Sequence, residues 1–214
     1  MKKISIVLAG LLCVAANAQS NGLFVGVNAG VPITTPSYTG FTGLKDNFPT
    51  SGFGWAVGLD VGYKQALSEN YGLKYYISYN YNQSKGSKDN STTIIGNVDA
   101  DINQHLITAN VDYWLNFTRS FGAYIGIGVG YQQYDPTWKT AMMSISAGAK
   151  GGLAVPLNVG LTYNFNDASQ ILLGAKIPLV AYDYESDTNP MLPMANGTAT
   201  LRTYIVQIGY NYTF

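Results

Sequence analysis

Residues 204–214 read YIVQIGYNYTF, and the pattern of this last stretch of the chain decides the fold. Every second position carries a large apolar side chain, whereas small or polar residues fall between them. The apolar set is Tyr204, Val206, Ile208, Tyr210, Tyr212 and Phe214, and the intervening set includes Gln207, Gly209, Asn211 and Thr213. A period of two residues indicates a β-strand with one apolar and one polar face.

The same alternation recurs along the rest of the chain and predicts eight strands. They lie at about residues 22–32, 53–67, 71–83, 104–117, 121–132, a sixth that ends near 165, 170–182 and 198–214. The start of the sixth strand stays open because Gly148 to Gly152 is rich in glycine. A strand needs about 9–11 residues to cross a membrane, and these runs reach that length.

The predicted connections alternate between short and long. The short ones lie at about residues 68–70, 118–120 and 166–169, and the long ones at about 33–52, 84–103, 133–143 and 183–197. Transmembrane barrels have short periplasmic turns and longer extracellular loops. In hydrocarbon every backbone polar group needs a partner, so the sheet must close. The sequence therefore predicts an eight-stranded antiparallel transmembrane β-barrel with short periplasmic turns and four longer extracellular loops.

The N-terminus has the features of a secretory signal. Lys2 and Lys3 precede an apolar run at residues 4–14, and Ala16-Asn17-Ala18 is a small-x-small cleavage site. We predict a signal peptide at residues 1–18 and an outer-membrane barrel at residues 19–214. The single cysteine, Cys13, could instead be a lipoprotein acylation site, but Leu12 precedes it where a small residue is expected.

Composition agrees with a β-protein that meets lipid. Charged residues make up 11% of the chain, which also has 17 tyrosines and 24 glycines. Removal of Lys2 and Lys3 from the 12 basic residues leaves 10 against 12 acidic ones. With no basic patch, nucleic acid is not an expected partner. We expect an integral protein of the bacterial outer membrane, in contact with its lipid and lipopolysaccharide.

Six charged residues fall on the inward faces of the predicted strands: Asp60, Lys64, Lys74, Asp112, Lys150 and Lys176. One interpretation is an ion path or a binding lumen. The alternative, which we favour, is that the charges pair within a filled interior, because eight strands leave room only for side chains. The tight turn at residues 68–70 should place Lys64 opposite Lys74, so that Asp60 or Asp112 approaches them.

Barrel enzymes that hydrolyse or transfer lipid acyl chains need a serine activated by a histidine. The single histidine, His105, has Ser84, Ser87, Asp99 and Asp101 nearby in sequence, but no serine stands beside it at a characteristic spacing. We therefore expect no enzyme activity, no cofactor and no metal site.

Two resemblances sharpen this interpretation. Val206, Ile208, Tyr210, Tyr212 and Phe214 resemble the C-terminal signal that the barrel-assembly machinery recognises. The segments GAKIP at 174–178, ATLRTY at 199–204 and GYNYTF at 209–214, and more weakly GLFVG at 22–26, resemble the Helicobacter outer-membrane protein family, the Hop and Hop-related proteins. That family includes porins and host-cell adhesins. This chain lacks the large extracellular domain of the adhesins.

The expected function is structural or surface-interactive, with the extracellular loops meeting host or environmental molecules. A narrow porin-like channel for ions or small solutes is the alternative, and a lipid-modifying enzyme is a distant third. A barrel fold alone does not select among these roles.

Overall fold

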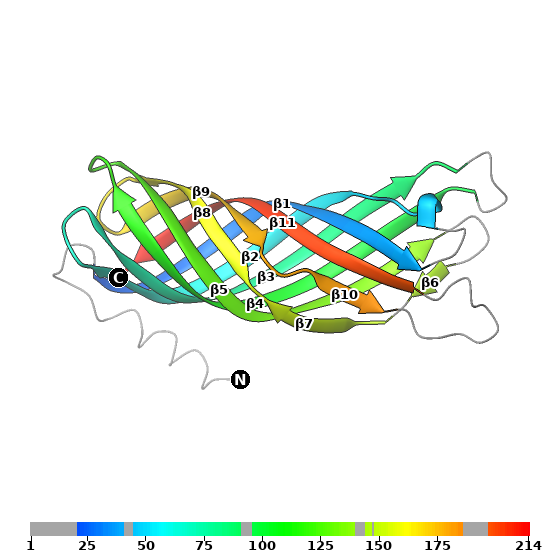
Figure 1. Ribbon diagram of the computed structural model, residues 1–214. Coiled ribbons are helices and arrows are strands. Elements are labelled where there is room, and N and C mark those ends of the chain that lie inside the picture. Colours follow the sequence, from blue (N-terminus) through cyan, green and yellow to red (C-terminus); the bar gives the residue numbers. More distant parts are fainter. Residues whose placement is uncertain (1–20, 41–44, 91–95, 140–143, 147, 186–196) are drawn as a thin grey trace, which may run out of the picture.

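The computed structural model describes residues 21–40, 45–90, 96–139, 144–146, 148–185 and 197–214. They form one antiparallel sheet that closes on itself (Figure 1). The strands are β1 (Gly22–Gly40), β2 (Gly52–Ala66), β3 (Tyr71–Lys88), β4 (Val98–Asn116), β5 (Phe121–Lys139), β6 (Ser144–Ser146), β7 (Lys150–Ala154), β8 (Pro156–Asn164), β9 (Ser169–Pro178), β10 (Tyr182–Glu185) and β11 (Gly197–Thr213). A short 3-10 helix, η1, spans Lys45–Asn47. The predicted signal peptide lies outside the described residues.

Closure comes from the pairing of β1 with β11, which runs from Phe24 opposite Thr213 to Gly40 opposite Gly197. β7 and β8 together form one strand of the barrel, and β9 and β10 form another. The closed barrel therefore has eight strands, as predicted. Ladder partners followed once around the ring from Gly22 return to β1 at Pro32, ten residues further on. At standard strand spacings this stagger corresponds to a tilt of roughly 40° and a backbone radius of about 8 Å.

The two faces of the wall follow the alternation of the sequence. On β11, Ile205, Gln207 and Asn211 are buried in the interior, whereas Val206 and Ile208 are exposed on the outside. The other long strands alternate in the same way. The outward side chains form the apolar band, and the interior takes small and polar residues. Among the described residues, no helix is long and apolar enough to cross a membrane.

Tight turns gather at the end of the barrel where the chain terminates (Figure 1). In each turn the backbone N–H of the residue after the first strand donates to the first residue of the next: Leu67 to Tyr71, Phe117 to Phe121, and Phe165 to Ser169. Outward aromatic side chains ring this end, among them Phe117, Phe121 and Phe165. A second group, including Trp55, Tyr79 and Tyr131, lies further along the strands.

At the opposite end the strands are longer than predicted. β1 continues to Gly40, β3 to Lys88 and β5 to Lys139, and β4 begins at Val98. Much of the predicted loops at 33–52, 84–103 and 133–143 is therefore paired strand. The prediction ended these strands where the apolar face ended. Backbone pairing does not require an apolar face once the strands leave the membrane, so the ladder continues.

Two of the predicted strands are interrupted at neighbouring positions. The sixth is split into β7 and β8 at Val155, before Pro156, which has no backbone N–H for the ladder. The seventh is split into β9 and β10, and between Lys176 and Tyr182 the wall holds two more residues than its partner β11. Pro156 lies opposite Pro178. Beyond this pair of prolines, β7 is paired with β5 and β10 with β11, so a seam separates β7 from β10.

Candidate functional site

Four of the predicted interior charges share one ladder row. Lys64 pairs with Lys74, Lys74 pairs with Asp112, and the row continues through Gly126 and Asn158 to Lys176. Asp60 lies four residues before Lys64 on β2, on the same inward face. All five charged side chains are at most 8% exposed. They occupy the half of the interior nearer to the tight turns.

Asn158 and Tyr76 hold the carboxylate of Asp112. The Tyr76 hydroxyl donates to Asp112 Oδ2 at 2.8 Å, and Asn158 Nδ2 donates to Oδ1 at 3.1 Å. Asn158 Oδ1 in turn accepts from Lys176 Nζ at 3.5 Å. The neutral side chain of Asn158 therefore links Asp112 to Lys176. No ion pair within 4 Å joins any two of the five interior charges.

A chain of amide side chains at the turn end of the barrel accepts a hydrogen bond from the ammonium group of Lys74. Its ammonium donates to Gln170 Oε1 at 2.5 Å, and Gln170 Nε2 donates to Asn164 Oδ1 at 2.7 Å. Asn164 then donates to Asn116 Oδ1 at 3.2 Å. This chain reaches from β3 to β9 and back to β4, so it braces opposite walls of the barrel.

Aromatic rings contact each of the three interior ammonium groups. The distances from Nζ to the ring centroid are 4.8 Å for Lys64 over Trp114, 5.6 Å for Lys74 over Phe24 and 5.8 Å for Lys176 over Tyr76. Such cation–π contacts offset part of the cost of removing an ammonium group from water.

Lys150 lies apart from the other five predicted charges. Its Nζ donates to the backbone oxygen of Glu185 at 2.7 Å and lies 5.2 Å from the centroid of the Tyr184 ring. It therefore bridges β7 and β10 across the seam, at the end of the barrel opposite the inner cluster. The sequence alone did not predict this separation, because the position of Lys150 along the barrel axis depends on strand register and tilt.

An apolar layer lies in the interior beyond the charged cluster. Ala56, Leu106, Ala154 and Ile205 pack against one another as a collar. These residues stand on the otherwise polar inward faces, and that departure from the alternation is the signal by which sequence reasoning could have found them.

Beyond the collar a hydrogen-bonded polar layer fills the interior. Gln104 Nε2 donates to the Tyr134 hydroxyl at 2.9 Å, and that hydroxyl lies 3.1 Å from Thr203 Oγ1. Thr203 is 3.0 Å from Thr34, which accepts from Ser84 at 2.8 Å. An outer apolar cluster follows, formed by Ile102, Tyr134, Tyr184, Ala199 and Leu201. The described residues thus fill this part of the lumen with two apolar layers and a hydrogen-bonded polar layer between them, in which Asn82 Oδ1 is buried without a partner.

The family comparison decides the identity of this barrel. A model of the outer membrane protein β-barrel domain matches residues 6–214, which is nearly the whole chain. The chain belongs to this family. It is an integral outer-membrane barrel, which confirms the predicted fold and the predicted localisation. No curated protein matches the sequence significantly.

Solved structures of outer-membrane barrels have the same fold. Neisserial surface protein A shares 14% identity over 92% of this chain and 100% of its own, with a TM-score of 0.56. The outer membrane protein OprG of Pseudomonas aeruginosa shares 16% identity over 92% and 98%, with a TM-score of 0.52. The outer membrane protease OmpT of Escherichia coli shares 8% identity over 94% and 99%, with a TM-score of 0.53. At these identities the likeness concerns the fold alone.

The narrower resemblance to the Helicobacter proteins finds no support in these comparisons. The matching family is the general barrel domain, and none of the structures above comes from Helicobacter. The segments that suggested it, such as residues 209–214, are the aromatic alternation of a closing strand. A pattern that membrane strands impose in general does not distinguish one family of this barrel class from another.

In this outer-membrane barrel, His105 and Ser84 face opposite sides of the wall, and the exposed Ser87 lies opposite Asp99, six residues from His105 along β4. His105 is exposed on the outside, with Nδ1 2.8 Å from the Tyr79 hydroxyl. Ser84 is buried in the interior, where it donates to Thr34. A histidine on the outer surface cannot accept a proton from a serine inside, so this pair does not form a nucleophile and base. In the described ranges, no group of three or more His, Cys, Asp or Glu residues could hold a metal ion.

On the outer surface, beyond the second group of aromatic side chains, Asp101 bridges two lysines. Lys139 Nζ lies 2.8 Å from Asp101 Oδ2, and Lys85 Nζ lies 3.8 Å from Oδ1. The hydrogen bond and charge of Asp101 raise the pKa of Lys139. These three side chains belong to the part of β3, β4 and β5 that extends past the membrane.

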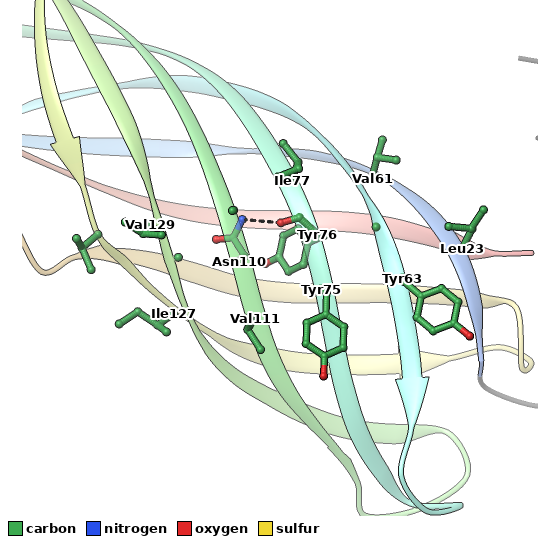
Figure 2. A pocket seen from close by; sticks show the side chains of 14 residues that line it. Leu23, Val61, Tyr63, Tyr75, Tyr76, Ile77, Asn110, Val111, Ile127 and Val129 are labelled. Carbon is green, nitrogen blue, oxygen red and sulfur yellow. Dashed lines mark hydrogen bonds between the residues drawn. The ribbon is translucent and has the colours of Figure 1, made fainter. Parts of the chain in front are cut away.

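A shallow apolar depression crosses the outer surface of the barrel (Figure 2). It runs over β1 to β5 and is lined by side chains such as Leu23, Val61, Val111 and Val129. Asn110 and Tyr76, which also border it, turn inward, where Asn110 Nδ2 donates to the Tyr76 carbonyl at 3.5 Å. The depression belongs to the apolar band that faces lipid.

Proposed function

We propose that this outer-membrane barrel acts at the cell surface, where its extracellular strand extensions and loops bind host or environmental molecules. The observation that carries the proposal is the filled interior, in which the collar of Ala56, Leu106, Ala154 and Ile205 lies between the charged cluster and the outer end. A lumen filled in this way leaves the outer surface as the part of the molecule that can meet a partner.

The extension offers a built surface for such a partner. On β4 the ladder continues to Val98 from His105, which lies at the level of the outer group of aromatic side chains. At a strand rise of about 3.3 Å and a tilt of roughly 40°, this carries the wall some 15–20 Å beyond that level. The outward side chains of β3, β4 and β5 are charged or polar here, with Asp101 held between Lys85 and Lys139. On the neighbouring β11, Thr200 donates to Asp183 at 2.6 Å. Lipopolysaccharide would surround its base.

The test removes the tip of the β3–β4 hairpin without disturbing the barrel. Gly86 lies opposite Ala100 in the β3–β4 ladder, so a two-residue Asn-Gly turn in place of residues 87–99 should close this hairpin. Vesicles carrying the full-length protein are expected to stay on an epithelial monolayer, and vesicles with the shortened protein are expected to wash off. Retention of both proteins to the same degree would contradict a surface role for this hairpin. Unchanged gel mobility of the unheated barrel is the control for folding.

A narrow channel is the second candidate, favoured by the charges in the inner half of the lumen. Planar-bilayer recordings separate the two functions. The surface role predicts no reproducible steps from the folded protein. Discrete, ion-selective steps that change in Lys74→Met or Asp112→Asn would make the channel the leading function. Enzyme activity is not part of our proposal, because Ser84 lies on the opposite side of the wall from His105 and Ser87 lies opposite Asp99, six residues along β4 from it. The Helicobacter relationship remains a sequence-based hypothesis.

A further inference from the structure

The buried charges at the turn end of the interior do not balance. Among the described residues the inner cluster holds three lysines, Lys64, Lys74 and Lys176, against two aspartates, Asp60 and Asp112. Both aspartates act electrostatically on Lys74 and on Lys176. Among the described residues no carboxylate lies within 4 Å of the Lys64 ammonium, and the one that acts on it, that of Asp167, belongs to the exposed turn between β8 and β9. A buried charge normally has a close counter-charge.

Lys64 also has unused hydrogen-bonding capacity. Lys74 donates to Gln170 and Lys176 reaches Asn158, but among the described residues the ammonium of Lys64 has only the face of the Trp114 ring, at 4.8 Å. An ammonium group carries three donors, and a ring face satisfies them incompletely.

The indole of Trp114 supplies a second unsatisfied donor at the same place. Trp114 is 3% exposed, and its Nε1 is buried with no hydrogen-bond partner in the structure. The ring packs across Gly72, where a side chain would meet its Cζ2 atom at 2.8 Å. Buried polar groups in folded proteins have partners, so an orphaned N–H beside an ammonium group whose counter-charge is exposed to solvent indicates a ligand that accepts hydrogen bonds and carries negative charge.

We propose that Lys64 and Trp114 bind one small inorganic anion, of the size of chloride, at the periplasmic end of the interior. Lys74, the ladder partner of Lys64, adds positive potential from the next strand. The burial of all three side chains restricts the ligand to a small ion. The bound anion neutralises the excess charge and joins β2 to β4 across β3. This site is independent of any partner at the cell surface.

Crystals of the refolded barrel soaked in sodium bromide give a direct test. The expected result is an anomalous peak at hydrogen-bonding distance, about 3.3 Å, from both Lys64 Nζ and Trp114 Nε1. No peak at this position in the native protein would overturn the proposal. A peak that remains in Lys64→Met would overturn the role assigned to Lys64.

Thermal unfolding in zwitterionic detergent tests the site in solution. A ligand that binds only the folded state raises the unfolding midpoint as its concentration rises. The midpoint of the native barrel should increase with chloride or bromide relative to equal concentrations of gluconate. Lys64→Met should abolish this increase and Trp114→Phe should reduce it, whereas Lys85→Met, on the outer surface, should keep it. Equal midpoints in halide and gluconate would refute the site, and a response to phosphate alone would refute the chloride-sized assignment.

Discussion

At the scale of single residues, Asp112 connects more of the interior than any other charge described above. It accepts hydrogen bonds from Tyr76 and Asn158 and is one of the two interior carboxylates near Lys74 and Lys176. Removal of one member of a buried charged network leaves the others uncompensated, which typically costs about 3–5 kcal/mol. We expect Asp112→Ala to lower the free energy of unfolding by this amount in urea titrations of the refolded barrel.

Asp101 is the matched surface control for that prediction. It contacts Lys139 and Lys85 at 2.8 and 3.8 Å, but both lysine side chains are more than half exposed. Exposed ion pairs contribute about 0–1 kcal/mol. Asp101→Ala should therefore change the free energy of unfolding little. Similar losses for Asp101→Ala and Asp112→Ala would mean that the interior network does not carry the stability assigned to it.

Tyr38 makes the extracellular extension sensitive to high pH. It lies near the outer end of β1, beyond the membrane, and burial raises its pKa from 10.0 to about 12. Between these values the folded side chain keeps its proton while the unfolded one has lost it, so stability falls as pH rises through this window. The extension should open progressively between about pH 10 and 12. Tyr38→Phe should reduce this loss, measured by hydrogen exchange of the outer part of β1.

At the scale of elements, glycines on β5 make room for the charged cluster. A Cβ at Gly126 would meet Asp112 Oδ1 at 2.0 Å and the Val111 carbonyl at 2.3 Å. Gly126→Ala should destabilise the barrel by about 1–3 kcal/mol through overpacking. Gly209→Ala on β11 is the control, because its nearest neighbour is the flexible Leu172 side chain at 3.0 Å. Equal urea midpoints for the two variants would contradict this account.

The seam between β7 and β10 is closed by side chains instead of a ladder. Lys150 donates to the Glu185 carbonyl at 2.7 Å, and the Tyr184 hydroxyl donates to the Gly148 carbonyl at 2.6 Å. Tyr182 packs over Gly152 in the same region. The double variant Lys150→Met with Tyr184→Phe should exchange amide hydrogens faster in β7 and β10 and unchanged in β8 and β9. Uniformly faster exchange would show that the seam is not a separate element.

The extent to which sequence predicted these elements follows from what lipid requires. Inside the membrane the outward face must be apolar, so alternation located β2 and β11 to within a residue or two. Above the membrane that requirement ends, and the extensions of β1, β3, β4 and β5 left no apolar period to detect. The split before Pro156 follows from the missing N–H of a residue that the sequence shows, whereas its position opposite Pro178 is a property of register. Alternation also assigned the charged residues to the inward face. Their grouping, with Lys150 apart from Lys64, depends on register and could not be predicted.

At the scale of the whole molecule, stagger and filling are linked. A ring of eight strands whose ladder returns ten residues further along β1 has a backbone radius of about 8 Å, which side chains from opposite walls can span. Lys74 does so when it reaches from β3 to Gln170 on β9. The narrow bore therefore explains both the buried charges and the apolar collar, since side chains from facing strands meet in the middle of the barrel.

The height of the membrane on the barrel can be mapped with arginine substitutions along β11. Ile208 is exposed midway between the outward side chains of Tyr212 and Tyr204. Arginine on the lipid face of a barrel costs about 2–4 kcal/mol at the bilayer midplane and about 0–1 kcal/mol near an interface. Ile208→Arg should therefore lower the free energy of unfolding in lipid vesicles far more than Tyr204→Arg. The native Arg202, which is exposed two residues beyond Tyr204, already marks a height that tolerates a cation. If both variants lost the same stability, the apolar band would not be centred on Ile208, and the extension above it would be shorter than the strand geometry indicates.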